Sequence, residues 1–222
     1  MQIDSISLQA VIPCVFEHEK DSAAVAASDV WLVPGLTFRR GEVYTVDAAS
    51  GMGKSSLCAF IFGTRTDYLG TISFDGRDVR SLHIADWCAL RRSNIAYMPQ
   101  NLDLFPQLSA IDNVLLKNRL TDFATEREIR AMLADLGLES RIDAPAAQLS
   151  VGQQQRVALV RAICQPFDFI LLDEPVSHLD AANNRLCADM VQRAASRLGA
   201  AIIATSVGNP LALQGHVTKI NL

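Results

Sequence analysis

Short hydrophobic runs recur along the chain and alternate with segments whose apolar positions follow helical spacing. Runs of this length, bounded by Gly, Pro or Asp, are typical of strands. We expect strands at residues 6–11, 30–38, 43–46, 71–74, 95–98, 169–172 and 200–204. Because the later runs alternate with helical patterns, the sequence predicts an α/β fold with a mainly parallel sheet.

The early runs are separated by turn-rich segments, at residues 38–41 and at Asp75-Gly76, which predict antiparallel hairpins and hence a β side sheet. Between residues 100 and 149 the pattern turns helical, with amphipathic stretches at 110–120 and 125–136. We therefore expect a single domain spanning the chain. Its core is predicted to comprise residues 1–99 and 150–222, and its inserted helical subdomain residues 100–149.

Composition narrows the classes of function. Half of the 222 residues are hydrophobic, enough to bury one sizeable core. The net charge of −4 offers no surface that would neutralise a phosphate backbone, so nucleic acid is not expected as a partner. Five scattered cysteines without metal-type pairs fit the reduced thiols of a cytosol. The amino terminus has no basic region and no run reads as a membrane span, so we expect membrane contact only through a partner.

The most informative segment follows the strand at 43–46 and leads into Lys54 and Ser55. It matches the phosphate-binding pattern G-x-x-x-x-G-K-[ST] at every position except the first, which is Ala48. Small residues let backbone N–H groups approach phosphates, Lys54 adds a positive charge, and the Ser55 hydroxyl can ligate Mg²⁺. The segment therefore predicts a P-loop NTPase core, against the alternative of a glycine-containing turn with a chance lysine. The residues expected at the nucleotide are Ala48, Ala49, Ser50, Gly51, Met52, Gly53, Lys54, Ser55 and Ser56.

Two carboxylates, Asp173 and Glu174, follow the buried-strand run at 169–172. Ligands of open α/β sheets bind at the carboxyl ends of the strands. Asp173 is suited to hold Mg²⁺ through water, and Glu174 to polarise a water for in-line attack on a γ-phosphate. Such a pair taken alone reads as a solvated strand end, but a P-loop upstream favours the catalytic interpretation.

A third motif starts at Ser150, which is a natural helix N-cap, and Gln153 completes a capping box. One interpretation is simply a well-capped helix. The amino terminus of a helix is also an anion site, which is the second interpretation.

With these motifs in order, the chain resembles the ATP-binding cassette (ABC) ATPases over essentially its whole length. The matching segments are 48–55 for Walker A, Gln100 for the Q-loop, 149–153 for the signature, 169–174 for Walker B and 177–180 for the D-loop. Residues 70–79 and 104–114 look like those of the stand-alone ATPases of lipoprotein-release, macrolide-export and cell-division ABC complexes.

The resemblance implies that two ATPase subunits sandwich two ATP molecules, with the P-loop of one chain facing the signature of the other. Gln100 would sense the γ-phosphate and Mg²⁺, and Ser150, Gly152 and Gln153 would reach the nucleotide across the interface. Asp180 would link the two sites. A membrane permease would dock in a groove near Leu104, Phe105 and Leu108, which places the chain on the cytoplasmic face of a membrane.

The chain departs from the family pattern in several places. Ser206 follows the last predicted core strand where the family carries a switch histidine, and losing a transition-state donor of this kind costs about 10²–10³ in rate. Val151 replaces a signature glycine. For the aromatic that stacks on adenine we favour Phe16 over Val15, with a core phenylalanine as the alternative interpretation.

The sequence thus predicts the ATP-binding and ATP-hydrolysing subunit of an ABC transporter-type complex, acting as a slow ATPase with ATP and Mg²⁺ and as a dimer with an identical or related chain. The alternative is a nucleotide-gated conformational switch with little or no hydrolysis, for which Ala48, Val151 and Ser206 argue. A DNA-maintenance ABC ATPase fits poorly, because no long coiled coil separates Lys54 from Ser150.

Overall fold

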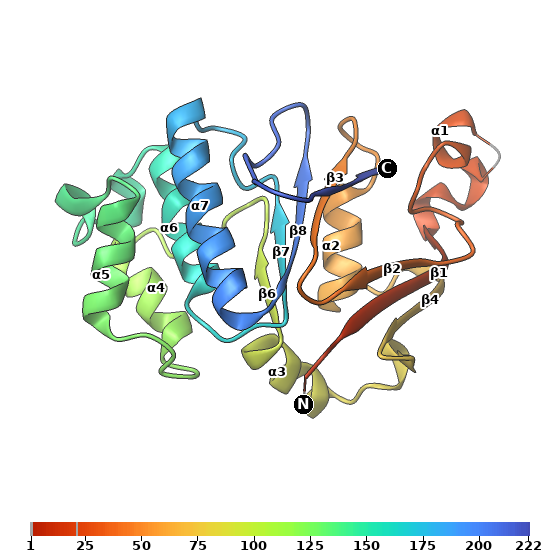
Figure 1. The fold of residues 1–222 in the computed structure, drawn as a ribbon, viewed down its shortest axis with the longest axis horizontal. Helices are drawn as coiled ribbons and strands as arrows, with labels where there is room; N and C mark the ends of the chain where they lie inside the picture. The colour runs from red at the N-terminus through yellow and green to blue at the C-terminus, as the bar shows by residue number, and fades with distance from the viewer. Residues whose placement is uncertain (1, 21) are drawn as a thin grey trace.

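A parallel sheet lies at the centre of the molecule in the computed structural model, which describes residues 2–20 and 22–222 (Figure 1). Its strands run in the order β6, β7, β8, β3, β9, and all neighbours are parallel. Their bounds are β3 Val43–Asp47, β6 Ile95–Met98, β7 Phe169–Asp173, β8 Ala201–Ser206 and β9 Thr218–Asn221. The expected α/β fold with a mainly parallel core sheet is confirmed.

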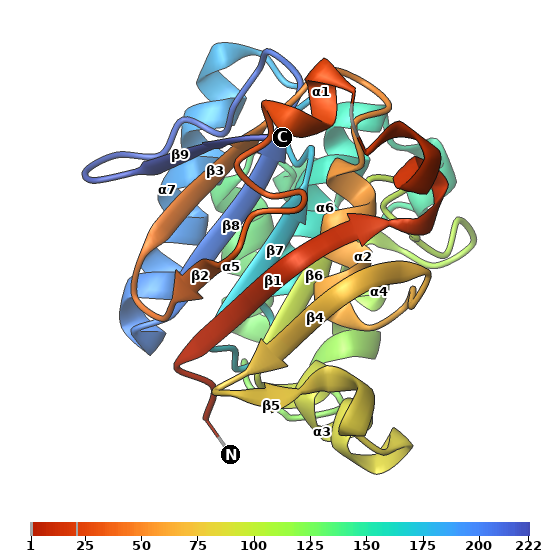
Figure 2. The same cartoon turned by 90° about the vertical axis from the view of Figure 1, so that its right-hand side faces the viewer.

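A second, antiparallel sheet lies beside the first, as Figure 2 shows. Its strand order is β2, β1, β4, β5, with bounds β1 Ser5–Pro13, β2 Leu36–Arg39, β4 Tyr68–Phe74 and β5 Arg77–Asp78. The turn at Asp75-Gly76 joins β4 to β5, and both residues have positive φ angles, of 49° and 81°. The predicted side sheet is therefore present.

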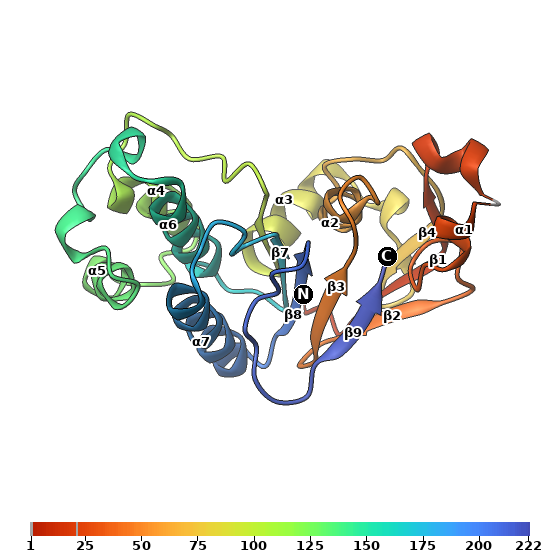
Figure 3. The same ribbon diagram turned by 90° about the horizontal axis from the view of Figure 1, so that it is seen from above.

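Helices cover both faces of the parallel sheet. The helices are α1 Ala23–Ala26, α2 Lys54–Phe62, α3 Ile84–Ser93, α4 Ala110–Asn118, α5 Glu126–Asp135, α6 Val151–Ile163 and α7 Ala181–Leu198. Short 3₁₀ helices occupy Cys14–Glu19, Val79–Ser81, Glu139–Arg141 and Ala146–Gln148. In Figure 3, α2 and α7 lie on opposite sides of the strands. None of the helices among the described residues is long and apolar enough to cross a membrane.

Strand β7 shows why the strands of this sheet are uninterrupted runs of hydrophobic residues. Phe169 and Leu171 pack with α2 and the antiparallel sheet, whereas Ile170 and Leu172 pack with α6 and α7 on the opposite face. Successive strand side chains point to opposite faces, so a sheet covered on both sides needs apolar residues at every position. All five β7 residues are buried.

The helical region contains α4, α5 and α6, which pack against one another at one end of the molecule (Figure 1). Thr125 and Ser150 cap α5 and α6, each in a capping box with the Glu or Gln three residues later. Helix α6 also contacts β6, so it joins the helical region to the sheet. The predicted boundaries of the helical subdomain, residues 100–149 between core residues 1–99 and 150–222, stay a prediction.

The predicted strand at residues 30–38 is wrong for residues 30–35, since only Leu36–Arg39 forms a strand. The backbone N–H groups of Val30 and Trp31 donate to Ser28 Oγ, at 3.0 and 2.8 Å. Side chains that bond nearby backbone groups compete with a sheet ladder. Residues 28–33 therefore form bends and a turn, which places Trp31 beside the loop that follows β3.

A buried carboxylate, that of Asp168, connects the start of the chain to both sheets. Its Oδ2 accepts hydrogen bonds from the backbone N–H of Ile3 (2.9 Å) and from Asn94 Nδ2 (2.6 Å). Its Oδ1 lies 3.2 Å from Arg40 Nε in an ion pair. Asp168 is 7% exposed, so its carboxylate has little access to water.

We expect Asp168→Ala to lower the free energy of unfolding by about 3 kcal/mol, because it removes a buried carboxylate that pairs with Arg40 and accepts two hydrogen bonds. Urea denaturation measures this change. Asp189→Ala, on the exposed side of α7, is the matched control and is expected to change the free energy by less than about 0.5 kcal/mol. Equal effects of the two substitutions would contradict the structural role of Asp168.

Candidate functional site

The carboxyl ends of β7, β8 and β3 lie level with one another at one edge of the parallel sheet. Residue pairing places Asp173 opposite Thr205 and Asp47 opposite Ser206. The loop after β3, the acidic pair after β7 and the end of β8 therefore meet at the edge where α/β folds bind ligands. The structure thus brings together motifs that lie far apart in the sequence.

The loop between β3 and α2 has the geometry of a phosphate cradle. Gly51 and Gly53 have positive φ angles of 85° and 96°, and Gly53 is the N-cap of α2. The first N–H groups of α2 are thus left for an anion. Lys54 is buried, and its Nζ donates to the carbonyl oxygens of Ala48 (3.2 Å) and Ala49 (3.0 Å). Ala48 does not have a positive φ, so alanine at the first position brings no backbone strain.

The acidic pair is held by Thr205. Its hydroxyl donates to Asp173 Oδ1 at 2.8 Å and accepts the backbone N–H of Glu174 at 3.1 Å. Glu174 has a φ of 51°, which is unusual for a residue other than glycine and is a strain that tends to occur at functional sites. Its Oε1 lies 3.6 Å from Lys54 Nζ. The lysine of the cradle and the candidate base therefore form an ion pair.

The donor set for Mg²⁺ consists of oxygen atoms, as this ion prefers. Ser55 Oγ lies 3.4 Å from Gln100 Oε1, so two of the three predicted ligands are adjacent. Asp173 Oδ2 is buried and has no hydrogen-bond partner among the described residues. A buried carboxylate oxygen without a partner costs folding free energy, and a cation or its water would satisfy it.

The thiol of Cys58 lies near Asp173. Burial raises the pKa of this thiol well above its ordinary value, which keeps the side chain neutral.

Ser206 is buried at the end of β8, and its hydroxyl donates to Asp47 Oδ1 at 3.1 Å. The side chain is thus engaged by the strand that leads into the cradle. Thr205, one residue earlier, is the residue that contacts the acidic pair. The structure therefore places Ser206 at the predicted edge of the sheet, with its hydroxyl hydrogen already donated to a carboxylate.

The signature residues lie at the start of α6, on the other side of the parallel sheet from α2 (Figure 3). Ser150 and Gln153 form the expected capping box, in which Ser150 N–H donates to Gln153 Oε1 at 2.9 Å. A Cβ on Gly152 would lie 3.0 Å from Leu179 and 3.1 Å from the carbonyl oxygen of His178. Val151, the first residue of the helix, is 50% exposed.

Asp180 is the N-cap of α7, and its Oδ1 accepts the backbone N–H of Asn183 at 2.8 Å. Hydrogen bonds from the backbone and the side chain of Asn183 lower the pKa of the Asp180 carboxyl. Asp180 is exposed, so the capped carboxylate stays available at the surface.

Two residues that contact the acidic pair or the loop after it, Gln155 and Thr205, escaped the sequence analysis. Gln155 is buried, donates to Ser177 Oγ at 2.9 Å and accepts the backbone N–H of His178 at 3.2 Å, so it joins α6 to the loop that follows Glu174. No local sequence motif marks Thr205 or Gln155, because their roles depend on contacts with residues distant in the sequence.

Phe16, the favoured adenine-stacking residue, is half-buried in the 3₁₀ helix Cys14–Glu19. Its ring edge would lie 3.3 Å from a Cβ on Gly53, so it packs beside the cradle. Val15 is 67% exposed. The stacking role of Phe16 stays a prediction.

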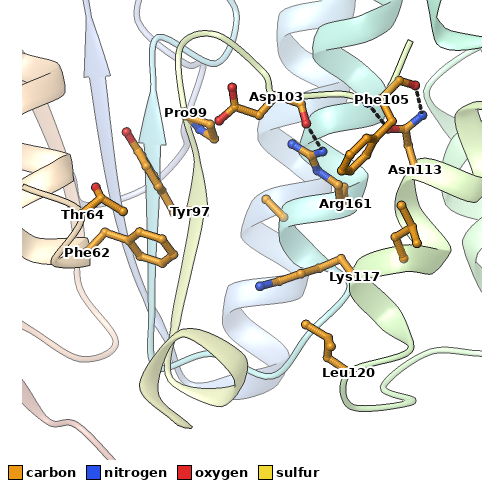
Figure 4. A pocket seen from close by; sticks show the side chains of 12 residues that line it. Phe62, Thr64, Tyr97, Pro99, Asp103, Phe105, Asn113, Lys117, Leu120 and Arg161 are labelled. Atoms are coloured by element: carbon orange, nitrogen blue, oxygen red, sulfur yellow. Dashed lines mark hydrogen bonds between the residues drawn. The ribbon is translucent and has the colours of Figure 1, made fainter. Parts of the chain in front are cut away.

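A groove of about 560 Å³ separates the sheet from the helical region (Figure 4). Phe62, Tyr97, Phe105, Leu116 and Leu120 give it an apolar lining, and Lys117 and Arg161 add positive charge. Of the three groove residues expected from the sequence, Phe105 lines it and is 55% exposed. Leu104 and Leu108 do not line it, and Leu104 packs inward against the helical core.

The fold and this sheet edge define a P-loop nucleotide-binding domain of the cassette type. The sequence model of the family described as "ABC transporter" matches residues 34–177. The chain belongs to the ABC transporter family.

Relatives of known name are similar over most of the chain. The lipoprotein-releasing system ATP-binding protein LolD of Novosphingobium aromaticivorans is 35% identical over 181 residues, which cover 80% of this chain and 81% of that protein. The uncharacterized ABC transporter ATP-binding protein YbbA of Escherichia coli K12 is 32% identical over 179 residues, covering 78% of each.

Solved structures agree on the fold. The dimeric structure of MJ0796, a bacterial ABC transporter cassette, has a TM-score of 0.77 at 22% identity and covers 97% of this chain and 94% of that chain. The structure of MJ0796 in a post-hydrolysis state bound to ADP and Pi has a TM-score of 0.73 at 24% identity, covering 90% and 87%.

We expect Thr205→Val to lower the free energy of unfolding by about 2 kcal/mol, because it leaves a buried carboxylate oxygen and the Glu174 N–H without their shared partner. Thr205→Ser is expected to lower the free energy of unfolding by only about 1 kcal/mol, because it keeps the hydroxyl and loses one buried methyl group. Chemical denaturation of both variants measures the difference. A valine variant as stable as the serine variant would contradict the bridging role of the hydroxyl.

Proposed function

We propose that this chain is the ATP-binding and ATP-hydrolysing subunit of an ABC transporter-type membrane complex, and that it closes as a dimer on ATP to drive its membrane partner. The observation that carries the proposal is the edge where Lys54, Asp173 and Glu174 meet. Lys54 and Glu174 lie 3.6 Å apart, and one buried oxygen of Asp173 has no partner in the part of the chain that the structure describes. A cation on a phosphate cradle, a metal-type carboxylate and a candidate base are the groups that nucleotide hydrolysis requires.

Each residue has a distinct role in this proposal. The backbone of residues 48–53 and the amino terminus of α2 bind phosphates, and Lys54 neutralises their charge. Ser55, Gln100 and Asp173 would hold Mg²⁺, which supplies charge neutralisation at the phosphates. Glu174 accepts a proton from the attacking water. Bound phosphates compete with Glu174 for Lys54, and this competition makes the carboxylate available for the base role.

A second ATPase subunit, identical or related, completes the site in this proposal. Ser150, Gly152 and Gln153 lie at the start of α6, which packs on the face of the sheet opposite to α2, the helix of the cradle. We therefore infer that the signature of a partner chain covers the nucleotide. The dimeric arrangement named for MJ0796, which has the same fold, agrees with this reading. Asp180, exposed at the start of α7, would link the two sites.

The membrane subunit is proposed to bind the groove of Figure 4 through a cytoplasmic helix. Aromatic and aliphatic side chains line this groove, and Phe105, Leu116 and Leu120 remain exposed in the isolated chain. Contiguous exposed apolar residues of this kind mark interaction sites. The names of LolD and YbbA, an ATP-binding protein of a lipoprotein-releasing system and one of an ABC transporter, support the ATP-binding role in such a complex. Docking to the membrane subunit would place the chain peripherally on the cytoplasmic face of a membrane.

The alternative function, a nucleotide-gated switch with little hydrolysis, is favoured by one observation. The Ser206 hydroxyl donates to Asp47 and is not free to donate to a developing negative charge. Slow turnover follows in either case, because the neutral serine replaces the switch histidine of the family. The intact pair of Asp173 and Glu174 argues for hydrolysis.

Glu174→Gln is expected to keep ATP binding, with an affinity at least as high as that of the wild type because a neutral amide no longer competes with the phosphates for Lys54. It is expected to lose hydrolysis, because an amide keeps the shape of the side chain but cannot accept a proton. Lys54→Ala is the matched control and is expected to weaken ATP binding by at least about 100-fold. Isothermal titration and a phosphate-release assay measure the two properties. Hydrolysis by Glu174→Gln at the wild-type rate would exclude Glu174 as the base.

Ser206→His is expected to raise turnover by about 10-fold or more, since an imidazole at this edge supplies a donor to the γ-phosphate. Ser206→Ala removes the hydroxyl without adding a donor and is expected to leave turnover low. Both are assayed alone and with Val151→Gly. A gain only in the Ser206→His and Val151→Gly double variant implicates both departures, and no gain in any variant supports the switch function.

A further inference from the structure

The indole of Trp31 lies against the phosphate cradle although it comes from a distant part of the chain. Trp31 is 1% exposed, and its Nε1–H donates to the carbonyl oxygen of Met52 at 3.1 Å. A Cβ on Gly53 would lie 2.9 Å from the ring carbon Cζ2 of Trp31. The ring therefore packs directly on the Met52–Gly53 peptide, and only glycine at position 53 leaves room for it.

The backbone of Trp31 is fixed by contacts that are independent of a nucleotide. Its N–H donates to Ser28 Oγ at 2.8 Å, and the N–H of Asp29 donates to the carbonyl oxygen of Asn221 at 2.8 Å. Asn221 N–H donates in return to Asp29 Oδ2 at 2.9 Å. Asn221 belongs to β9, which pairs with β3, the strand that leads into the cradle. Trp31 and the cradle thus share one scaffold.

The hydrogen bond to Met52 determines where the next amide group points. The peptide bonds of the described residues are trans. The carbonyl of Met52 and the N–H of Gly53 therefore lie in one peptide plane and point in opposite directions. With the carbonyl turned toward the indole, the N–H of Gly53 is directed away from the indole. In the described part of the chain no protein acceptor takes this N–H.

We propose that Trp31 is a positioning residue of the nucleotide site: it holds the Met52–Gly53 peptide so that the Gly53 N–H faces the phosphates. The inference rests on the proposed function, because it concerns the same cradle. Pre-orienting a donor avoids the cost of ordering it when the ligand binds. Trp31 should therefore matter for nucleotides that carry phosphates in the cradle and not for the adenosine part alone.

Two substitutions test this role in the full chain. Trp31→Phe keeps an aromatic ring and removes the donor. Trp87→Phe is the matched control, because Trp87 packs against Gly63 at the opposite end of α2 and the chain has no other tryptophan. We expect the dissociation constant for Mg-ADP, measured by isothermal titration, to rise about 5- to 10-fold in Trp31→Phe, the loss of one hydrogen bond. In Trp87→Phe it should change less than about twofold.

Fluorescence supplies a readout that a purely structural role would not move. In Trp87→Phe, Trp31 is the sole tryptophan, and its emission should shift on saturation with Mg-ADP and stay unchanged with adenosine. Adding Lys54→Ala to this variant should abolish the shift. In Trp31→Phe, the emission of Trp87 should not respond to Mg-ADP.

The outcomes separate this inference from the proposed function. If the wild-type chain does not bind Mg-ADP, the proposed function itself fails. If it binds, equal affinities of Trp31→Phe and Trp87→Phe overturn the role of Trp31 alone. If Trp31→Phe does not fold, the fluorescence arm decides: no response of Trp31 to saturating Mg-ADP overturns the inference, and a response that adenosine does not produce supports it.

Discussion

The ion pair of Lys54 and Glu174 is the interaction on which the nucleotide edge depends. Burying an ammonium group is costly unless its protons find partners, and here the carbonyl oxygens of Ala48 and Ala49 together with Glu174 surround Nζ. The two carbonyls tie the lysine to its own loop, so the loop is kept in the cradle form. Glu174 is the exchangeable partner, because phosphates can take its place beside the cation. In the proposed function, the same pair stabilises the site before a nucleotide binds and gives way to the phosphates afterwards.

Much of this edge could be predicted from the sequence, because strands buried on two faces are continuous hydrophobic runs. Strands β3, β6 and β7 were predicted to within one residue at either end. The contacts between strand ends could not be predicted, because they depend on register. Thr205 reaches Asp173, and Ser206 reaches Asp47, only once β8 pairs with β7 on one side and with β3 on the other. The strand predicted at residues 30–38 was wrong at its start for a related reason. The Ser28 hydroxyl accepts the backbone N–H groups of Val30 and Trp31, which a strand would have used for its ladder.

The segment from β6 to α4 connects the nucleotide edge to the groove. Gln100 lies at its start beside Ser55, and Phe105 lies further along at the groove. Between them, Arg161 of α6 donates to the carbonyl oxygens of Leu102 and Asp103. Burial lowers the pKa of Arg161, yet its guanidinium stays charged and holds two carbonyls of the segment at once. A partner that displaces Phe105 therefore acts on a short stretch anchored at its middle, with Gln100 at the other end.

The hydrogen bond between Ser206 and Asp47 bears on the choice between the two candidate functions, ATP hydrolysis and a switch driven by nucleotide binding alone. Position 47 is at the end of β3, directly before the cradle, so its carboxylate places negative charge beside the cradle. A histidine at 206 would meet this carboxylate, and a neighbouring negative charge favours the protonated imidazole. The protonated form has donors on both ring nitrogens, one for Asp47 and one for a phosphate. Serine has a single hydrogen to donate, and Asp47 takes it. In the proposed function, the donor available to a phosphate at this edge therefore depends on residues 47 and 206 together, because the carboxylate that would orient an imidazole accepts the only hydrogen that serine can donate.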